Sequence, residues 1–178
     1  MTTALDYALM AGASYFSTRS DLNRFPLPAD WTERLEFRTK FDRSGFEAAT
    51  FQKGTDVVIS FAGTSPGAAD WIHGNIPLLN GALSDQLRDA ADYYLQVKAS
   101  LPAGTHITLT GHSLGGGLAA LIAVMFGETA VTFDQLPVRN AAEFYKTTVN
   151  EIEATRSAAQ DLRAYLDGRC FLYFHKGG

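Results

Sequence analysis

The first half of the chain consists of short apolar segments separated by turn residues. Residues 5–16 are rich in apolar side chains and predict a helix, whereas residues 25–31 contain two prolines and predict an irregular connection. Residues 35–41 alternate between apolar and polar positions, which is typical of a half-buried strand. Residues 46–51 and 57–62 lie on either side of a Lys-Gly turn. They predict a hairpin whose second strand, apolar almost throughout, is buried on both faces.

The second half of the chain alternates predicted helices with predicted strands. Ser84 is the expected N-cap of a helix whose mostly apolar positions recur at helical spacing. These positions are Leu87, Ala91, Tyr94, Leu95 and Lys98. Residues 107–110 and 130–133 predict strands, and residues 114–126 between them predict a buried helix.

The last part of the sequence continues the same alternation. Residues 144–166 predict a long amphipathic helix, and residues 170–175 predict a strand. The helix has apolar side chains at steps of three and four: Phe144, Tyr145, Val149, Ile152, Ala159, Leu162 and Leu166. The whole pattern predicts an α/β fold, a mostly parallel sheet with flanking crossover helices and the hairpin as an antiparallel edge. We expect a single domain over residues 1–178. We also expect the sheet to continue past Gly178, since such sheets do not usually end directly after a strand.

Composition and charge narrow the possible partners. With 178 residues and 46% hydrophobic side chains, the chain can bury one sizeable core. A net charge of -4 and the lack of a basic cluster argue against a nucleic-acid partner. Residues 1–6 lack the basic and apolar regions of a secretory signal, which leaves a cytoplasmic location and a non-Sec export route open. The longest apolar stretch, residues 114–127, is too short to cross a bilayer.

One motif in the chain points to a specific chemistry. The pentapeptide from Gly111 to Gly115 has the form G-x-S-x-G, with Ser113 at its centre. It lies between a predicted strand and a predicted helix, which is the setting that a nucleophile elbow requires. In such a turn the serine hydroxyl projects above the sheet, close to the amides of the helix N-terminus, where an oxyanion would form. The alternative interpretation is a glycine-rich turn with an exposed serine.

A second motif lies at the end of the predicted hairpin. Residues 57–65 form an apolar strand that ends in the turn Gly63-Thr64. In serine hydrolases with a strand–elbow–helix arrangement, the loop after an early strand supplies the second oxyanion donor, and a threonine there offers both its backbone N–H and its hydroxyl. By itself this segment is equally consistent with a capped strand end and a surface loop.

Taken together, these motifs resemble the class 3 (fungal-type) lipase family. The resemblance covers residues 57–137 and includes, in the family's order, Phe-Ala-Gly-Thr at 61–64, a Trp-bearing segment at 70–76, Gly-His-Ser-Leu-Gly-Gly at 111–116 and Thr-Phe at 132–133 followed by Pro137. It implies a sheet of the α/β-hydrolase type, with the N–H groups of Thr64 and Leu114 as oxyanion donors. It also implies that residues 65–79 form a lid whose apolar side chains make transient contact with a lipid interface.

The catalytic base and acid are less clearly indicated by the sequence. Hydrolases of this fold place the nucleophile, acid and histidine in that chain order, and only His175 of the four histidines follows the elbow. Asp134 is the candidate acid, because among the carboxylates after Ser113 it alone follows a predicted strand at the edge where the serine lies. Class 3 lipases carry their acid after the next strand and their histidine later in the chain. For these reasons His175 can also be a structural residue, and Asp134 a turn cap before Pro137.

These observations predict a carboxylic ester hydrolase that acts on lipid or small esters through an acyl-enzyme on Ser113. The expected catalytic residues are Ser113, Asp134 and His175. No cofactor is expected, and no cluster with metal-ligand spacing is present in the sequence. The rival hypotheses are a catalytically weak or inactive lipase-like binding domain and a small esterase without a lid.

Overall fold

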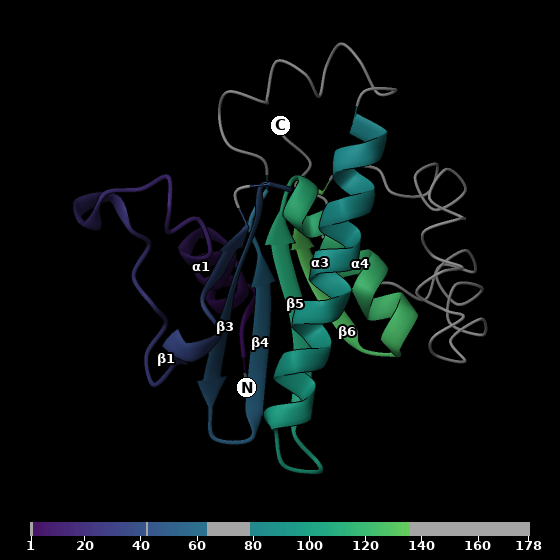
Figure 1. Cartoon of the computed structure of the whole chain (residues 1–178). Helices are drawn as coiled ribbons and strands as arrows, with labels where there is room; N and C mark the ends of the chain where they lie inside the picture. Colours follow the sequence, from purple (N-terminus) through teal and green to yellow (C-terminus); the bar gives the residue numbers. More distant parts are fainter. Residues whose placement is uncertain (1, 42, 64–78, 136–178) are drawn as a thin grey trace.

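The computed structural model describes residues 2–41, 43–63 and 79–135, and within these residues six strands form one mixed sheet (Figure 1). The strand order is β1-β3-β4-β5-β6, and β2 also pairs with β3. The elements are α1 (Ala4–Ala13), η1 (Asp21–Asn23), β1 (Thr32–Glu33), η2 (Leu35–Phe37), β2 (Thr39–Phe41), β3 (Phe46–Lys53), β4 (Asp56–Phe61), α3 (Leu79–Ser100), β5 (His106–His112), α4 (Leu114–Phe126) and β6 (Thr129–Phe133).

The sheet combines a parallel and an antiparallel part. Strands β4, β5 and β6 are parallel neighbours, so their carboxyl ends meet at one edge of the sheet. Strand β3 runs antiparallel to β4 and carries the short strands β1 and β2 on its other side, also antiparallel. The predicted fold class, a mostly parallel sheet with an antiparallel edge and flanking helices, is therefore confirmed.

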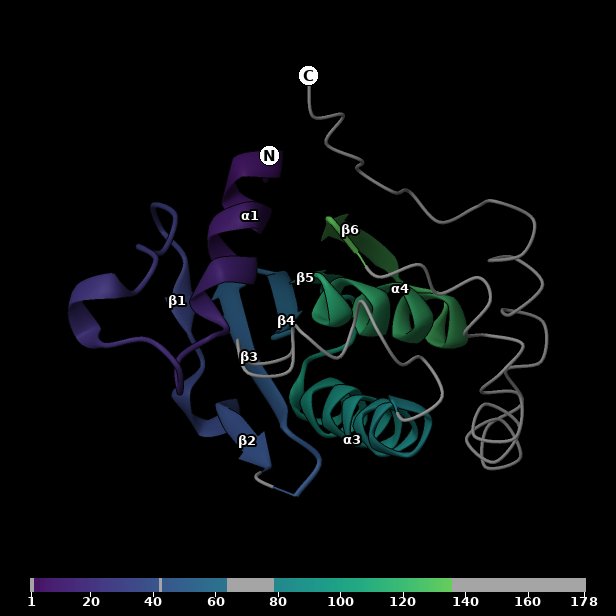
Figure 2. The ribbon, with the colours of Figure 1, turned by 90° about the horizontal axis from the view of Figure 1, so that it is seen from above.

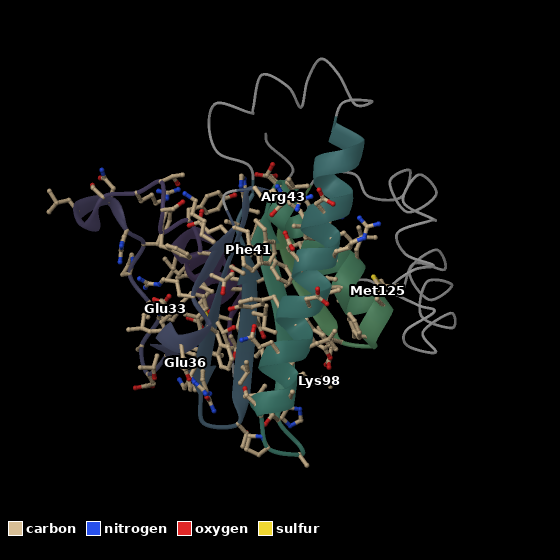
Figure 3. All side chains as sticks on the ribbon, in the orientation of Figure 1. Glu33, Glu36, Phe41, Arg43, Lys98 and Met125 are labelled. Carbon is tan, nitrogen blue, oxygen red and sulfur yellow. The ribbon has the colours of Figure 1, made fainter. Side chains whose placement is uncertain are left out.

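Helices cover both faces of the sheet. Helices α3 and α4 lie on one face and α1 lies on the other, which is clearest when the molecule is seen from above (Figure 2). Side chains fill the space between the sheet and the flanking helices (Figure 3). Met125 of α4 is one of the buried side chains. Because successive residues of a strand point to opposite faces, the same strands contribute to both cores.

The two faces hold two separate clusters of buried apolar side chains. The α3/α4 face includes Phe46, Phe61 and Tyr93, whose ring centres are 5.8–6.2 Å apart. The smaller cluster, on the α1 face, consists of Met10, Trp31, Ala49, Phe51 and Val58. Adjacent residues such as Val57 and Val58 belong to opposite clusters, which is the alternation that a doubly covered strand requires.

Several predicted boundaries differ from those in the structure. The first helix ends at Ala13 rather than at residue 16, with Ser14 as its C-cap. Residues 35–41 form not one strand but a 3-10 turn, η2, followed by β2. Helix α3 begins at Leu79, ahead of the predicted cap at Ser84. The predicted helix over 144–166 and the predicted strand over 170–175 lie outside the described residues.

No helix in the described part of the chain is both long enough and apolar enough to span a bilayer.

Candidate active site

Ser113 forms a sharp turn between β5 and α4. Its backbone angles are φ 56° and ψ -123°, a conformation that residues with a Cβ rarely adopt. Two hydrogen bonds hold this turn: the N–H of Ser113 donates to the carbonyl of Phe133 at 3.1 Å, and the N–H of Gly117 donates to the carbonyl of Ser113 at 3.1 Å. The Ser113 side chain is half-buried and makes no capping hydrogen bond to α4. A strained serine at a strand–helix turn is the geometry of a nucleophile elbow.

The glycines of the motif permit the close backbone approach at this turn. A Cβ on Gly111 would lie 2.4 Å from the backbone carbon of Gly115, and one on Gly115 would lie 2.1 Å from the carbonyl oxygen of Phe61. A Cβ atom at either position would therefore clash with backbone atoms, which cannot move aside as a side chain can. The G-x-S-x-G spacing is thus explained by the geometry of β5, α4 and the end of β4.

The end of β4 lies beside the serine. Phe61 pairs with Gly111, so Gly63 and Ser113, each two residues further on, are at the same level of the sheet. A Cβ on Gly63 would be 2.9 Å from the carbonyl oxygen of His112 and 3.4 Å from the Cβ of Ser113. The residue after Gly63 is Thr64, a predicted oxyanion donor, which lies outside the described residues. Leu114, the other predicted donor, is the first residue of α4, whose leading amides have no acceptor within the helix.

Tyr15 is a residue of this site that the sequence did not reveal. Its hydroxyl lies 3.4 Å from Nδ1 of His112 and 3.3 Å from the carbonyl oxygen of His112, to which it donates. Burial raises the pKa of the Tyr15 phenol above its usual value, so the group stays protonated near neutral pH. The only signal in the sequence was its place near the end of the predicted helix over 5–16. No periodic pattern links that position with residue 112.

Asp134 lies where the sequence placed it, directly after β6. Phe133 pairs with His112, so Asp134 is at the same edge of the sheet as Ser113. Its backbone φ is 40° and its side chain is exposed. His106, by contrast, begins β5 and is therefore at the opposite edge. His175, His73 and residues 65–78 of the predicted lid (65–79) lie outside the described residues, so the catalytic roles of His175 and Asp134 stay predictions.

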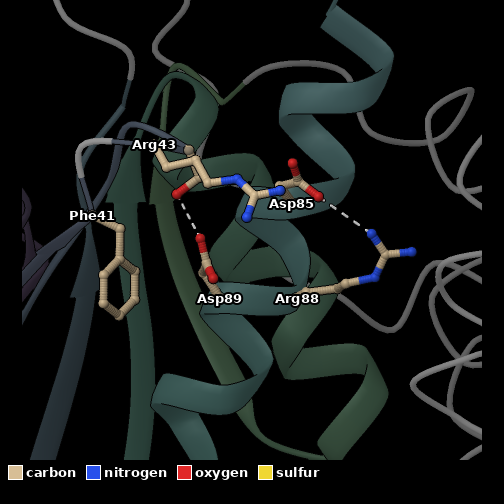
Figure 4. Close-up of a pocket in the computed structure, with 6 residues that line it drawn as sticks. Phe41, Arg43, Asp85, Arg88 and Asp89 are labelled. Carbon is tan, nitrogen blue, oxygen red and sulfur yellow. Dashed lines mark hydrogen bonds and ion pairs between the residues drawn. The ribbon is translucent and has the colours of Figure 1, made fainter.

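A separate hollow of about 310 Å³ lies between α3 and the turn that precedes β3 (Figure 4). Its lining residues are Phe41, Arg43, Ser44, Asp85, Arg88 and Asp89. Asp89 accepts a hydrogen bond from the Ser44 hydroxyl at 2.5 Å, and Arg88 pairs with Asp85 at 3.3 Å. The first contact attaches the turn to α3, whereas the second lies within α3. None of the six residues belongs to the predicted catalytic set. Among the described residues, no group of three or more His, Cys, Asp or Glu side chains could hold a metal ion.

The fold and the elbow together define the class of protein: an α/β-hydrolase-like domain with a candidate nucleophilic serine. Comparison with solved structures agrees on the fold. The lipase of Rhizomucor miehei, solved as a propeptide complex, is 18% identical, with a TM-score of 0.53 over 82% of this chain and 57% of that one. The lipase of Rhizopus microsporus var. chinensis is 16% identical, with a TM-score of 0.57 over 82% of this chain and 62% of that one.

Residues 12–168 match the family described as phospholipase-like, the Tle-like phospholipase domain, and the chain belongs to this family. A curated relative, the extracellular phospholipase A1 of Serratia liquefaciens, is 35% identical over 117 residues, which are 66% of this chain. The chain spans about a third of the length of that relative, 34%.

Proposed function

We propose that this domain is a serine-dependent hydrolase of lipid esters, of the phospholipase or lipase type. The observation that carries the proposal is Ser113, held at φ 56° between β5 and α4 with its hydroxyl not used as a helix cap. A strained backbone conformation persists only where the surrounding contacts enforce it, and such conformations are common at functional sites. Membership of the phospholipase-like family and the phospholipase A1 relative favour an ester of a phospholipid as substrate.

In the proposed reaction, the Ser113 hydroxyl oxygen attacks the ester carbonyl carbon while a histidine takes the hydroxyl proton. The backbone N–H groups of Leu114 and Thr64 stabilise the oxyanion. The C–O bond to the alcohol then breaks, and the histidine gives its proton to the departing oxygen. Water repeats the sequence on the acyl-enzyme and releases a carboxylic acid. We assign the histidine as His175 and its carboxylate partner as Asp134, and residues 65–79 as a lid that contacts lipid.

A fluorophosphonate probe and a soluble ester, p-nitrophenyl butyrate, test this proposal together. We expect the probe to label the wild-type chain, and Ser113→Ala to lose both labelling and hydrolysis. His175→Ala should lower hydrolysis by about three orders of magnitude or more. His106→Ala is the matched control, because His106 lies at the opposite edge of the sheet and should leave the rate unchanged.

The possible results separate the hypotheses. If the wild-type chain is neither labelled nor active, the lipase-like binding domain is favoured and the proposal fails. If Ser113→Ala is inactive but His175→Ala retains full activity, Ser113 is the nucleophile and the assignment of His175 is wrong.

A further inference from the structure

The segment between α1 and β1, residues 17–30, projects from the body of the molecule, and we call it the N-terminal arm (Figures 1 and 2). Every residue from Leu22 to Leu27 is exposed. Three of them are large apolar side chains: Leu22, 96% exposed, Phe25, 40% exposed, and Leu27, 36% exposed. A single exposed leucine is ordinary, but three exposed large apolar side chains within six residues of sequence favour contact with an apolar phase.

The N-terminal arm is held in place by specific contacts with the body. At its start, the buried carboxylate of Glu47 accepts hydrogen bonds from the backbone N–H and the hydroxyl of Ser17, each at 2.7 Å. Phe25 packs against Gly12 of α1, where a Cβ would be 2.7 Å from the ring, and the Arg19 guanidinium lies 4.7 Å from the ring centre. Since these contacts fix the base of the arm, the exposure of Leu22 is a feature of the folded structure.

The place of the arm in the fold suggests what it contacts. In Figure 1 the tip of the arm, dark purple at the far left, lies near the level of the carboxyl ends of β4 and β5, where the elbow serine is. The tip therefore lies toward the same end of the sheet as Ser113, and a lipid layer that presents substrate to Ser113 approaches the molecule from that end. Leu5, another strongly exposed leucine, is in the first turn of α1, beside the N-terminus at the opposite end.

We propose that residues 22–27 are a lipid-docking surface that inserts Leu22 into the apolar boundary of a phospholipid layer. The inference rests on the proposed function, since the substrate of a lipid hydrolase is presented by such a layer. Apolar insertion is the main contribution, because the chain as a whole carries a net charge of -4.

Binding to vesicles of phosphatidylcholine, measured by flotation, tests the proposal. All proteins carry Ser113→Ala so that the vesicles stay intact. We expect the chain to bind, binding to persist in 0.5 M NaCl, and Leu22→Ser to weaken binding by about tenfold or more. Leu5→Ser is the matched control, a leucine-to-serine change at a site 67% exposed, and should bind like the parent. Thermal unfolding should show the same midpoint for both variants, because neither leucine is buried.

The following results would overturn the proposal. The parent chain does not bind vesicles, or Leu22→Ser binds as well as the parent. Alternatively, Leu22→Ser and Leu5→Ser lose binding equally, or binding by the parent is lost in 0.5 M NaCl. Dimerisation that Leu22→Ser abolishes, without vesicle binding, would show a second copy of the chain as the occupant.

Hydrolysis by the chain with Ser113 intact is measured separately on p-nitrophenyl butyrate. If vesicles bind but the soluble ester is not cleaved, the proposed function fails while the docking surface stands.

Discussion

The strained backbone at Ser113 presents the candidate nucleophile but lowers the stability of the fold. A residue with a Cβ is disfavoured at φ 56°, whereas glycine adopts this conformation readily. We therefore expect Ser113→Gly to be more stable than Ser113→Ala by about 1 kcal/mol in urea unfolding, although both lack the nucleophile. Ala120→Gly in the middle of α4 is the control, and should lower stability by about 1 kcal/mol. A Ser113→Gly chain that is less stable than Ser113→Ala would show that the turn is not strained.

Tyr15 acts on the same site from a distant part of the sequence. Its hydroxyl contacts the carbonyl of His112 and lies against Gly63, the residues just before the nucleophile and just before the predicted oxyanion donor Thr64. Loss of this contact should loosen the relative placement of the two groups more than it weakens substrate binding. We expect Tyr15→Phe to lower kcat for p-nitrophenyl butyrate by about tenfold with little change in KM.

The matching control for Tyr15→Phe is Tyr7→Phe. Tyr7 is also an aromatic residue of the N-terminal segment, but it packs against the small core on the α1 face. An equal fall in kcat for both variants would indicate a general effect on folding, and an unchanged kcat for Tyr15→Phe would contradict the positioning role.

At the level of elements, one buried hydrogen bond links α3 to the sheet. The hydroxyl groups of Tyr93 and Thr50 lie 2.8 Å apart, both inside the core. Burial raises the pKa of the Tyr93 phenol above its ordinary value, so the folded state favours the protonated form. This contribution to stability is fully present below pH 10 and is lost as the pH rises further, because the tyrosine ionises first in the unfolded chain.

We therefore expect Tyr93→Phe to flatten the decline of the free energy of unfolding above pH 10. At pH 7 the variant should be less stable by about 1 kcal/mol, because the Thr50 hydroxyl loses its partner. Thr50→Val removes the same hydrogen bond but keeps the phenol, so its stability should still decline above pH 10. Urea unfolding at pH 7, 10 and 11 distinguishes the two variants, and equal slopes would contradict the assignment to Tyr93.

The elements also show which features can be predicted from the sequence. The hairpin, β5, α4 and β6 have strong local patterns, and the structure contains them near the predicted boundaries. Strand β1 consists only of Thr32–Glu33 and forms by pairing with β3. This pairing leaves no pattern in the local sequence, so it could not be predicted. Helix α3 begins before Ser84 because Leu79 and Leu83 continue the four-residue spacing to Leu87, so the serine is inside the helix instead of at its start.

In the candidate site, too, features with a local sequence pattern could be predicted, whereas those that depend on tertiary contacts could not. Ser113 and its glycines were predictable because the elbow is a contiguous segment with a strict steric requirement. Asp134 could be placed at the correct edge because parallel strands end together. Tyr15 could not be predicted, because its contact with His112 joins residues 97 positions apart through the packing of α1 on the sheet.

At the scale of the whole molecule, the two cores share one set of strands. Val57 belongs to the α3/α4 face and Val58 to the α1 face, and β3 and β4 supply residues to both. If the core on either face unfolded, the strands would be exposed on that side, although the core on the other face is built on the same strands. The described residues should thus lose their structure together instead of as two independent layers.

Met10 and Ile122, one fully buried on each face, provide the test. We expect Met10→Ala and Ile122→Ala each to lower the free energy of unfolding by about 2–5 kcal/mol, with one transition and an unchanged m-value. Leu5→Ala, an exposed position on α1, should change it by less than about 0.5 kcal/mol. If Met10→Ala instead separates an early transition, seen by circular dichroism in urea, the α1 face is an independent layer. The N-terminal arm, which is anchored on α1 and β3, would then detach from the body before the elbow unfolds.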